Sequence, residues 1–336
     1  MEINNLISVI VCHHKGDFIY KFIESVKNSI NVQYEIIIVT SDDELASNGI
    51  KGCYVVNNYG GPAEKRNVGA RLAKGNYLAF FDDDVEINSD CLSQMLKHVI
   101  SHSIDMVYGK LYNMERRNRF DEAGGYLTST GFIWSRAGQN DIDLGQYDKT
   151  DRILAGKSAS CMVKSTAFWD VDGFDEDFWI LGEETDLSWR LQIKGYTVWF
   201  LPSAIGYHAF NTKFKPAKEY YNSKRVHRFG CRNYITMLIK NLGVRNLWNI
   251  LPIHCLIWFT ASIVMLFTGK LRQGTNILLG ISDVLINLKR VLIKRQLIQS
   301  NRVKNDKDLW PYIFRKAPKG YYTQRFCRYL RIGLHG

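Results

Sequence analysis

The most constraining feature of the amino-terminal part is a set of short apolar runs that alternate with segments of helical pattern. The apolar runs fall at residues 7–12, 35–40, 53–56 and 77–81, and the helical patterns at about 17–29 and 63–73. This rhythm predicts an α/β fold with a mostly parallel, doubly wound, Rossmann-like sheet. The runs are apolar almost throughout, as strands buried on both faces are. Ligands of such sheets bind at the carboxyl ends of strands, so we expect the chemistry directly after each run.

Three aspartates, Asp82, Asp83 and Asp84, directly follow the run at 77–81. Carboxylates beside a core cost several kcal/mol unless a positive charge neutralises them. In an extended segment Asp82 and Asp84 project to the same side, and hard oxygen ligands favour Mg²⁺ or Mn²⁺. The motif therefore predicts a cation site, with a solvated turn as the alternative. His208 follows a later apolar run and two carboxylate clusters, which makes it a candidate ligand, although a lone histidine is usually structural.

A glycine turn at residues 60–61 leads into a helical pattern that carries Arg66 and Asn67. A helix N-terminus with an arginine predicts a contact with a phosphate or a base. Asp42 follows the second apolar run, where a carboxylate can accept hydrogen bonds from a nucleobase or ribose. An aspartate after a strand is also a common turn former, so both interpretations of Asp42 stay open.

A second acidic block contains Glu183, Glu184 and Asp186. Adjacent carboxylates repel, so at least one of them tends to have a raised pKa, which is how a general base is tuned. The alternative is an acidic first turn of a helix, which the macrodipole stabilises. Between these blocks, residues 113–152 are polar and rich in glycine, and we expect an irregular loop or edge region that shapes an acceptor site.

The two parts of the chain differ in charge. Residues 1–210 carry 20 Lys and Arg against 29 Asp and Glu, whereas residues 211–336 carry 24 against 4. A strongly basic part suits phosphates, either of nucleic acid or of anionic lipids. Its aromatic residues lie in apolar helical segments and not on a strand platform, so we predict a membrane surface as partner and no nucleic acid.

The apolar part of the tail is long enough to matter for membranes. Residues 246–269 include no Asp, Glu, Lys or Arg, which is sufficient length for a span, although Asn249, Pro252 and His254 interrupt it. Residues 276–298 have helical apolar spacing and end in a basic cluster. Buried core helices, a single span and amphipathic helices at the membrane surface are the three interpretations, and we favour the last. Seven scattered cysteines without a C-x-x-C pair indicate reduced thiols, and hence the cytoplasmic face of the membrane.

Taken in order, these segments resemble the family 2 glycosyltransferases with a GT-A fold. The likeness spans about residues 6–210, and its matching motifs are the strand 7–11, Arg66-Asn67-x-Gly69, Asp82-Asp83-Asp84 in place of the family's DxD, Gly173-Phe174-Asp175-Glu176, Glu183-Glu184-x-Asp186-Leu187 with Arg190, Gly195-Tyr196, Pro202 and His208. The tail resembles the membrane-associated extension of the rhamnosyltransferase-like branch. This implies a GT-A catalytic domain over 1–215, a helical membrane-associating extension over 216–300 and a basic tail over 301–336.

The resemblance also implies an activity: inverting transfer of a hexosyl group from a UDP- or dTDP-sugar to a lipid-linked or polysaccharide acceptor in cell-surface glycan synthesis. The implied donor contacts are Cys12, Asp42, Arg66, Asn67, Asp82 and Asp83. The implied ligands of Mn²⁺ or Mg²⁺ are Asp84, Asp82 and His208. The implied catalytic residues are Glu184 as the base, with Glu183 and Asp186.

Two departures from the family pattern leave details open. Glu183-Glu184 stands where the family often has Glu-Asp, so either glutamate could be the base. Cys12-His13-His14-Lys15 replaces the usual proline and threonine or serine, which leaves the nucleotide choice open. The alternative functions are a catalytically decayed nucleotide-sugar-binding module and a metal-dependent sugar nucleotidyltransferase, whose glycine-rich signature followed by lysine is not found in residues 7–16.

Overall fold

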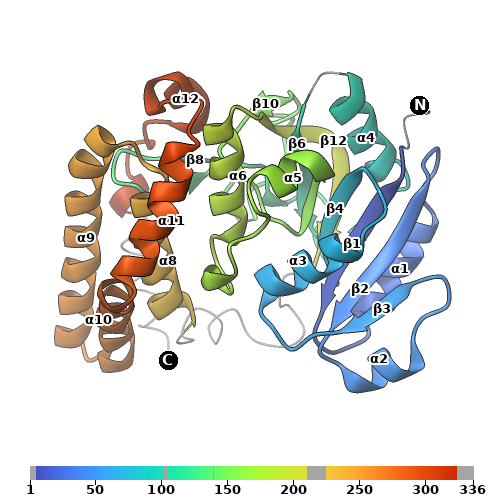
Figure 1. Ribbon diagram of the computed structural model, residues 1–336, viewed down its shortest axis with the longest axis horizontal. Coiled ribbons are helices and arrows are strands. Elements are labelled where there is room, and N and C mark those ends of the chain that lie inside the picture. The colour runs from blue at the N-terminus through green and yellow to red at the C-terminus, as the bar shows by residue number, and fades with distance from the viewer. Residues whose placement is uncertain (1–4, 102–103, 139, 210–224, 324–336) are drawn as a thin grey trace. The chain divides into compact units, whose positions relative to one another are not determined.

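The computed structural model describes residues 5–101, 104–138, 140–209 and 225–323, and these form two compact units (Figure 1). The first unit comprises the chain up to residue 125 together with 135–179 and 183–210. The second comprises 126–134, 180–182 and the chain from 211 onward. The predicted boundary between residues 215 and 216 lies outside the described residues.

A mixed, mostly parallel sheet forms the centre of the first unit, with the strand order β10-β12-β6-β11-β4-β1-β2-β3. β5 pairs with β12 and β7 with β6, while β8 and β9 form a separate two-stranded sheet. The strands are β1 (Ile7–His13), β2 (Tyr34–Thr40), β3 (Tyr54–Asn57), β4 (Tyr77–Asp82), β5 (Val85–Ile87), β6 (Met106–Asn113), β7 (Phe120–Glu122), β8 (Gly125–Leu127), β9 (Ile133–Ser135), β10 (Asp151–Arg152), β11 (Ser160–Lys164) and β12 (Val198–His208). β11 runs antiparallel between β4 and β6.

Helices cover both faces of this sheet. They are α1 (Phe18–Lys27), α2 (Asp43–Asn48), α3 (Pro62–Leu72), α4 (Cys91–Ser101), α5 (Ser165–Asp170), the 3₁₀ turn η1 (Glu176–Phe178) and α6 (Glu183–Lys194). Neighbouring residues of β4 show the two faces: Phe81 contacts Phe22 of α1, and Phe80 contacts Phe168 of α5, with ring centroids 5.6 and 5.4 Å apart. Successive side chains of a strand point to opposite faces, so β4 is buried from both sides. The predicted doubly wound α/β fold is thereby confirmed.

The second unit is mainly helical. Its helices are η2 (Arg225–Phe229), α8 (Gly230–Asn241), α9 (Val244–Phe267), α10 (Leu271–Ile286), α11 (Leu288–Ser300) and α12 (Asp306–Ile313). The amphipathic segment predicted over 276–298 is two helices, α10 and α11, because Asn287 ends one and begins the other. The described part of the predicted basic tail contains α12, which begins with a capping box at Asn305.

Basic side chains of the second unit also serve its own fold. The last carbonyls of a helix lack partners within the helix. At the end of α8, Arg295 donates to the carbonyl of Leu242 at 2.6 Å, and Gln299 donates to that of Lys240 at 2.8 Å. Cations near a helix C-terminus also interact favourably with the macrodipole. Arg295, one of the predicted basic cluster, therefore stabilises the junction of α8 and α11.

Helix α9 is long and apolar, but its polar residue His254 lies inside the unit. The buried residues of α9 form one stripe: Ile250, His254, Trp258, Ser262 and Met265. His254 Nδ1 lies 2.8 Å from the carbonyl oxygen of Thr130, and Trp258 Nε1 donates to His254 Nε2 at 2.9 Å. Among the described residues α9 is the one helix whose length and composition suffice to cross a membrane. Its outward face is apolar, with Leu256 and Phe259 63% and 52% exposed.

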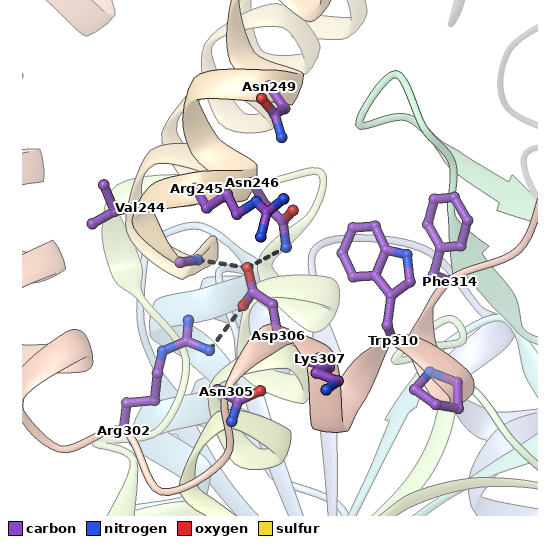
Figure 2. A pocket seen from close by; sticks show the side chains of 12 residues that line it. Val244, Arg245, Asn246, Asn249, Arg302, Asn305, Asp306, Lys307, Trp310 and Phe314 are labelled. Atoms are coloured by element: carbon purple, nitrogen blue, oxygen red, sulfur yellow. Dashed lines mark hydrogen bonds and ion pairs between the residues drawn. The ribbon is translucent and has the colours of Figure 1, made fainter.

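A hollow of about 970 Å³ opens where α9 begins (Figure 2). Asp306 is buried at its base and accepts hydrogen bonds from the Gly243 amide and Asn246 Nδ2, both at 2.8 Å, and from Arg302 Nη1 at 2.9 Å. Anions are stabilised at helix N-termini. The protein therefore supplies its own anion at the start of α9 and fixes α12 to it.

Candidate active site

The predicted site residues of β1 and β4 lie side by side. The two strands are parallel, with Cys12 opposite Asp82 in the register, so their carboxyl ends meet at one rim of the sheet. His13 Nδ1 lies 2.5 Å from Asp83 Oδ2 across this rim. Burial raises the pKa of Asp83, and the His13 hydrogen bond opposes that rise. Asp83 is thus already engaged with a side chain that the sequence analysis left without a role.

The structure brings the three predicted metal ligands together. One ligand atom from each of Asp82, Asp84 and His208 lies within 4.8 Å of the others. Backbone pairing accounts for this, because β12 runs antiparallel to β5 with His208 opposite Val85, and the amide of residue 209 donates to the Asp84 carbonyl at 2.9 Å. Two carboxylates and one imidazole are a donor set that divalent cations accept, and the carboxylates suit Mg²⁺ or Mn²⁺.

His208 is buried and lies between two carboxylates. Its Nε2 is 3.1 Å from Asp84 Oδ1, and its Nδ1 is 2.8 Å from Asp121 Oδ2. Burial alone would lower the pKa of His208, but Asp84 and then Asp121 outweigh it and raise the pKa to about 10. Without a cation, the imidazolium itself supplies the positive charge that this acidic pocket needs.

Arg66 connects the rim to the second acidic block. The Arg66 side chain is 4% exposed, and its guanidinium donates to Asp82 Oδ1 and to Glu183 Oε1, each at 2.8 Å. Burial alone would lower the pKa of Arg66, but Asp82 foremost and also Glu183 raise it. A permanent cation between two carboxylates fixes their positions. The predicted phosphate contact of Arg66 stays a prediction, because these bonds already occupy two of its nitrogens.

The three acidic residues of α6 have different surroundings. Glu183 is buried against Arg66, whereas Glu184 is half-buried. Burial, followed by the neighbouring Glu183, raises the pKa of Glu184 well above its usual value. Asp186 is fully buried and accepts from Arg190 Nε at 2.7 Å. The predicted catalytic role of Asp186 stays a prediction.

Other predicted donor contacts are engaged within the protein. Asn67 Nδ2 donates to the carbonyl of Phe174 at 2.8 Å, and Asn67 Oδ1 accepts from the Phe174 amide at 2.9 Å. Asp42 Oδ1 caps α2 by accepting from the amides of residues 44 and 45, as a turn former does. Burial raises the pKa of the Cys12 thiol to about 12, so it stays protonated beside the rim. Contacts of these three residues with a nucleotide stay predictions.

Two polar residues at the site, Lys65 and Asp121, were not predicted from the sequence. Lys65 is buried and donates to the carbonyl of His13 at 2.6 Å and to Ser41 Oγ at 3.0 Å. The one feature of the sequence that could have indicated a role for Lys65 is that it precedes Arg66. Asp121, the partner of His208, lies in the stretch 113–152 that was predicted to be an irregular loop or edge region and that contains the short strands β7, β8, β9 and β10. Nothing in the local pattern around Asp121 indicated a partner 87 residues away.

Part of the chain is similar to known glycosyltransferases. The sequence model described as glycosyl transferase family 2 matches residues 8–151. Pre-mycofactocin glycosyltransferase of Mycobacterium tuberculosis (strain ATCC 25618 / H37Rv) is 28% identical over 163 residues, which are 46% of this chain and 31% of that protein. Rhamnosyltransferase WbbL of Escherichia coli (strain K12) is 25% identical over 248 residues, which are 68% of this chain and 93% of that protein. The chain thus spans about a third of the first relative and most of the second.

Solved structures share the fold. GalNAc-T7, crystallised with UDP, GalNAc and Mn²⁺, superposes with a TM-score of 0.57 at 15% identity, over 86% of this chain and 58% of that one. TarS of S. aureus superposes with a TM-score of 0.53 at 16% identity, over 90% of this chain and 53% of that one. At this level of identity the likeness concerns the fold alone.

Proposed function

We propose that this protein is an inverting hexosyltransferase, because residues 8–151 match the model of glycosyl transferase family 2 and the fold is GT-A. Its donor is a nucleoside diphosphate sugar, and its acceptor is a lipid-linked or polysaccharide hydroxyl group. The observation that carries the proposal is a continuous series of contacts at the rim. Asp82 belongs to the candidate cation site and also pairs with Arg66, and Arg66 pairs in turn with Glu183.

The donor set at the rim fits a divalent cation. Asp84, Asp82 and His208 would hold Mn²⁺ or Mg²⁺, and a cation bound there neutralises negative charge on a departing diphosphate. Asp82 would share its carboxylate between this site and Arg66. Asp83, fixed by His13, lies next to the same site and is the proposed contact for the donor sugar or ribose.

Glu184 is the proposed base. Glu183 is committed to Arg66, whereas Glu184 is half-buried next to it with a raised pKa. In the transfer step Glu184 accepts the proton of the acceptor hydroxyl while the oxygen of that hydroxyl bonds to the anomeric carbon of the donor sugar. The bond from that carbon to the diphosphate oxygen breaks on the opposite face, which inverts the configuration. A positioned base of this kind contributes typically about 10²- to 10⁴-fold to the rate.

The relatives support a nucleotide sugar as the donor. The GalNAc-T7 structure contains UDP and Mn²⁺, and the match to the rhamnosyltransferase WbbL covers 93% of that protein. We therefore propose a UDP- or dTDP-sugar as donor and cell-surface glycan synthesis as the setting.

The second unit supports attachment to a membrane surface. The outward faces of α9, α10 and α11 expose large apolar side chains, among them Trp248, Leu256, Phe267, Leu285 and Leu297, each at least 60% exposed. Apolar helix faces with nearby basic residues bind anionic lipid interfaces. The cysteines outside residues 324–336 are free thiols, which agrees with the cytoplasmic face.

The test uses Glu184→Gln with a panel of UDP- and dTDP-sugars in the presence of Mn²⁺. We expect donor affinity within about twofold of wild type and turnover, measured as donor hydrolysis or transfer, lower by about 10²- to 10⁴-fold. Glu24→Gln on the exposed side of α1 is the matched control and should leave both values unchanged. Lost donor affinity with preserved turnover would contradict the assigned role. A protein that binds donors but never turns them over in wild-type form would instead be a decayed binding module.

A further inference from the structure

We propose that Asp121 is a positioning residue that fixes the ring orientation and the tautomer of His208 in the cation site. This inference rests on the proposed function, because it concerns the cation that the function requires. It is carried by the geometry behind His208, on the side away from Asp84.

A strand irregularity aims Asp121 at the histidine. In the pairing of β6 with β7, Leu111 lies opposite Glu122 and Tyr112 lies opposite Phe120, so Asp121 is the extra residue of a bulge. Bulges commonly re-aim a side chain next to active sites. β6 also pairs with β12, which ends in His208. Two strands that flank β6 thus bring together residues that are far apart in the sequence.

Both carboxylate oxygens of Asp121 have a defined partner. Oδ2 lies 2.8 Å from His208 Nδ1, and Oδ1 lies 2.7 Å from the ammonium of Lys157. The side chain of Asp121 is only 3% exposed, whereas that of Lys157 is 29% exposed. A buried carboxylate needs such pairing to remain charged. Lys157 therefore supports Asp121 from the solvent side, and Asp121 supports His208 from within.

The chemistry of the imidazole explains how Asp121 can affect cation binding. A ring nitrogen that binds a metal must carry no proton, and the hydrogen bond of the other nitrogen decides which tautomer is present. A carboxylate only accepts hydrogen bonds, so it places the proton of the neutral ring on Nδ1. Nε2, which lies 3.1 Å from Asp84, is then left with its lone pair toward the cation site.

The experiment must separate positioning from simple charge, because removing any carboxylate weakens the attraction of a cation. Mn²⁺ alone is titrated into the full-length protein, and its Kd is measured from the electron paramagnetic resonance signal of free Mn²⁺. The variants are Asp121→Ala, His208→Ala and the double variant. We expect Asp121→Ala to raise the Kd by about 10- to 100-fold in the wild-type background and to have no further effect once His208 is absent.

A conservative variant and a matched control complete the design. Asp121→Asn retains size and one acceptor oxygen, so it should recover part of the lost affinity, and it replaces Asp121→Ala if the alanine variant does not fold. Asp105→Ala removes another aspartate that pairs with a lysine, Lys164 at 3.0 Å, without touching His208; its side chain is 16% exposed. Its Kd for Mn²⁺ should equal that of wild type.

Three outcomes would overturn the inference. A wild-type Kd in Asp121→Ala, with weakened binding in Asp84→Ala, would remove the role of Asp121 and leave the proposed cation site intact. An equal loss with and without His208 would show that only charge is involved. No Mn²⁺ binding by the wild-type protein would remove the cation site itself, and the proposed function would lose its metal.

Discussion

The two units depart from the usual distribution of polar and apolar groups in opposite directions. The first unit buries charged groups at one rim of its sheet, where Arg66 and Glu183 are 3% and 4% exposed. The second unit exposes apolar groups along its helices, where Trp248 and Phe267 are 75% and 87% exposed. Buried charges and clustered exposed apolar residues both mark sites of function, because each costs free energy in the isolated protein.

The same contrast holds for the interiors of the two units. In the second unit the two buried polar residues of α9 are satisfied by hydrogen bonds: His254 by Thr130 and Trp258, and Ser262 by the carbonyl of Gly274. The unusual feature of this unit is therefore its exposed apolar surface. In the first unit the unusual feature is the set of buried charges at the rim of the sheet.

The largest expected effect concerns the buried charges. Arg66→Met leaves Glu183 buried without its cation, and breaking a buried pair in this way costs about 3–5 kcal/mol. The measurement is the free energy of unfolding in urea. Arg71→Met on the same helix removes the pair with Glu176, whose members are 56% and 42% exposed, and should cost at most about 1 kcal/mol. Equal losses in the two variants would contradict the view that α3 carries one functional and one superficial ion pair.

The second effect concerns the exposed apolar face. Leu256→Glu combined with Phe259→Glu removes two side chains from the outward face of α9, each worth about 1.5–3 kcal/mol when buried. We expect sedimentation with anionic vesicles to weaken by about 100-fold in the partition constant. Asn249→Glu adds a charge to the same helix without removing apolar surface, and should reduce binding much less. Unchanged sedimentation of the double variant would leave α9 as an ordinary helix of a soluble protein.

The smallest expected effect is a difference in pH dependence between turnover, which depends on the first unit, and vesicle binding, which depends on the second. The raised pKa of Glu184 keeps part of the enzyme protonated, and only the ionised base accepts a proton, so turnover should increase with pH by at most about tenfold per unit until the pKa is passed. Vesicle binding through apolar residues, Lys and Arg should change little between about pH 6 and 8, because none of these groups titrates there. A turnover that is flat with pH, or falls as pH rises, would exclude Glu184 as the base.

Much of the fold and part of the site could be predicted from local pattern. The apolar run at 77–81 became β4, and the aspartates that follow it lie at its carboxyl end as expected. Hydrophobic periodicity depends on residues that are close in the sequence, so it predicts strands, helices and the polar residues at their ends. The antiparallel direction of β11 and the helix break at Asn287 could not be predicted from the sequence, since both depend on which elements pack against these segments.

The sequence by itself determined which residues carry charge at the ends of strands and how the apolar and basic groups divide between the two parts of the chain. The tertiary structure alone decided the partnerships: Arg66 with Glu183, 117 residues away, and His208 with Asp121, 87 residues away. The physical reason is that side-chain contacts between distant segments depend on strand order and register. Both are settled by the packing of the whole sheet and not by neighbours in the chain.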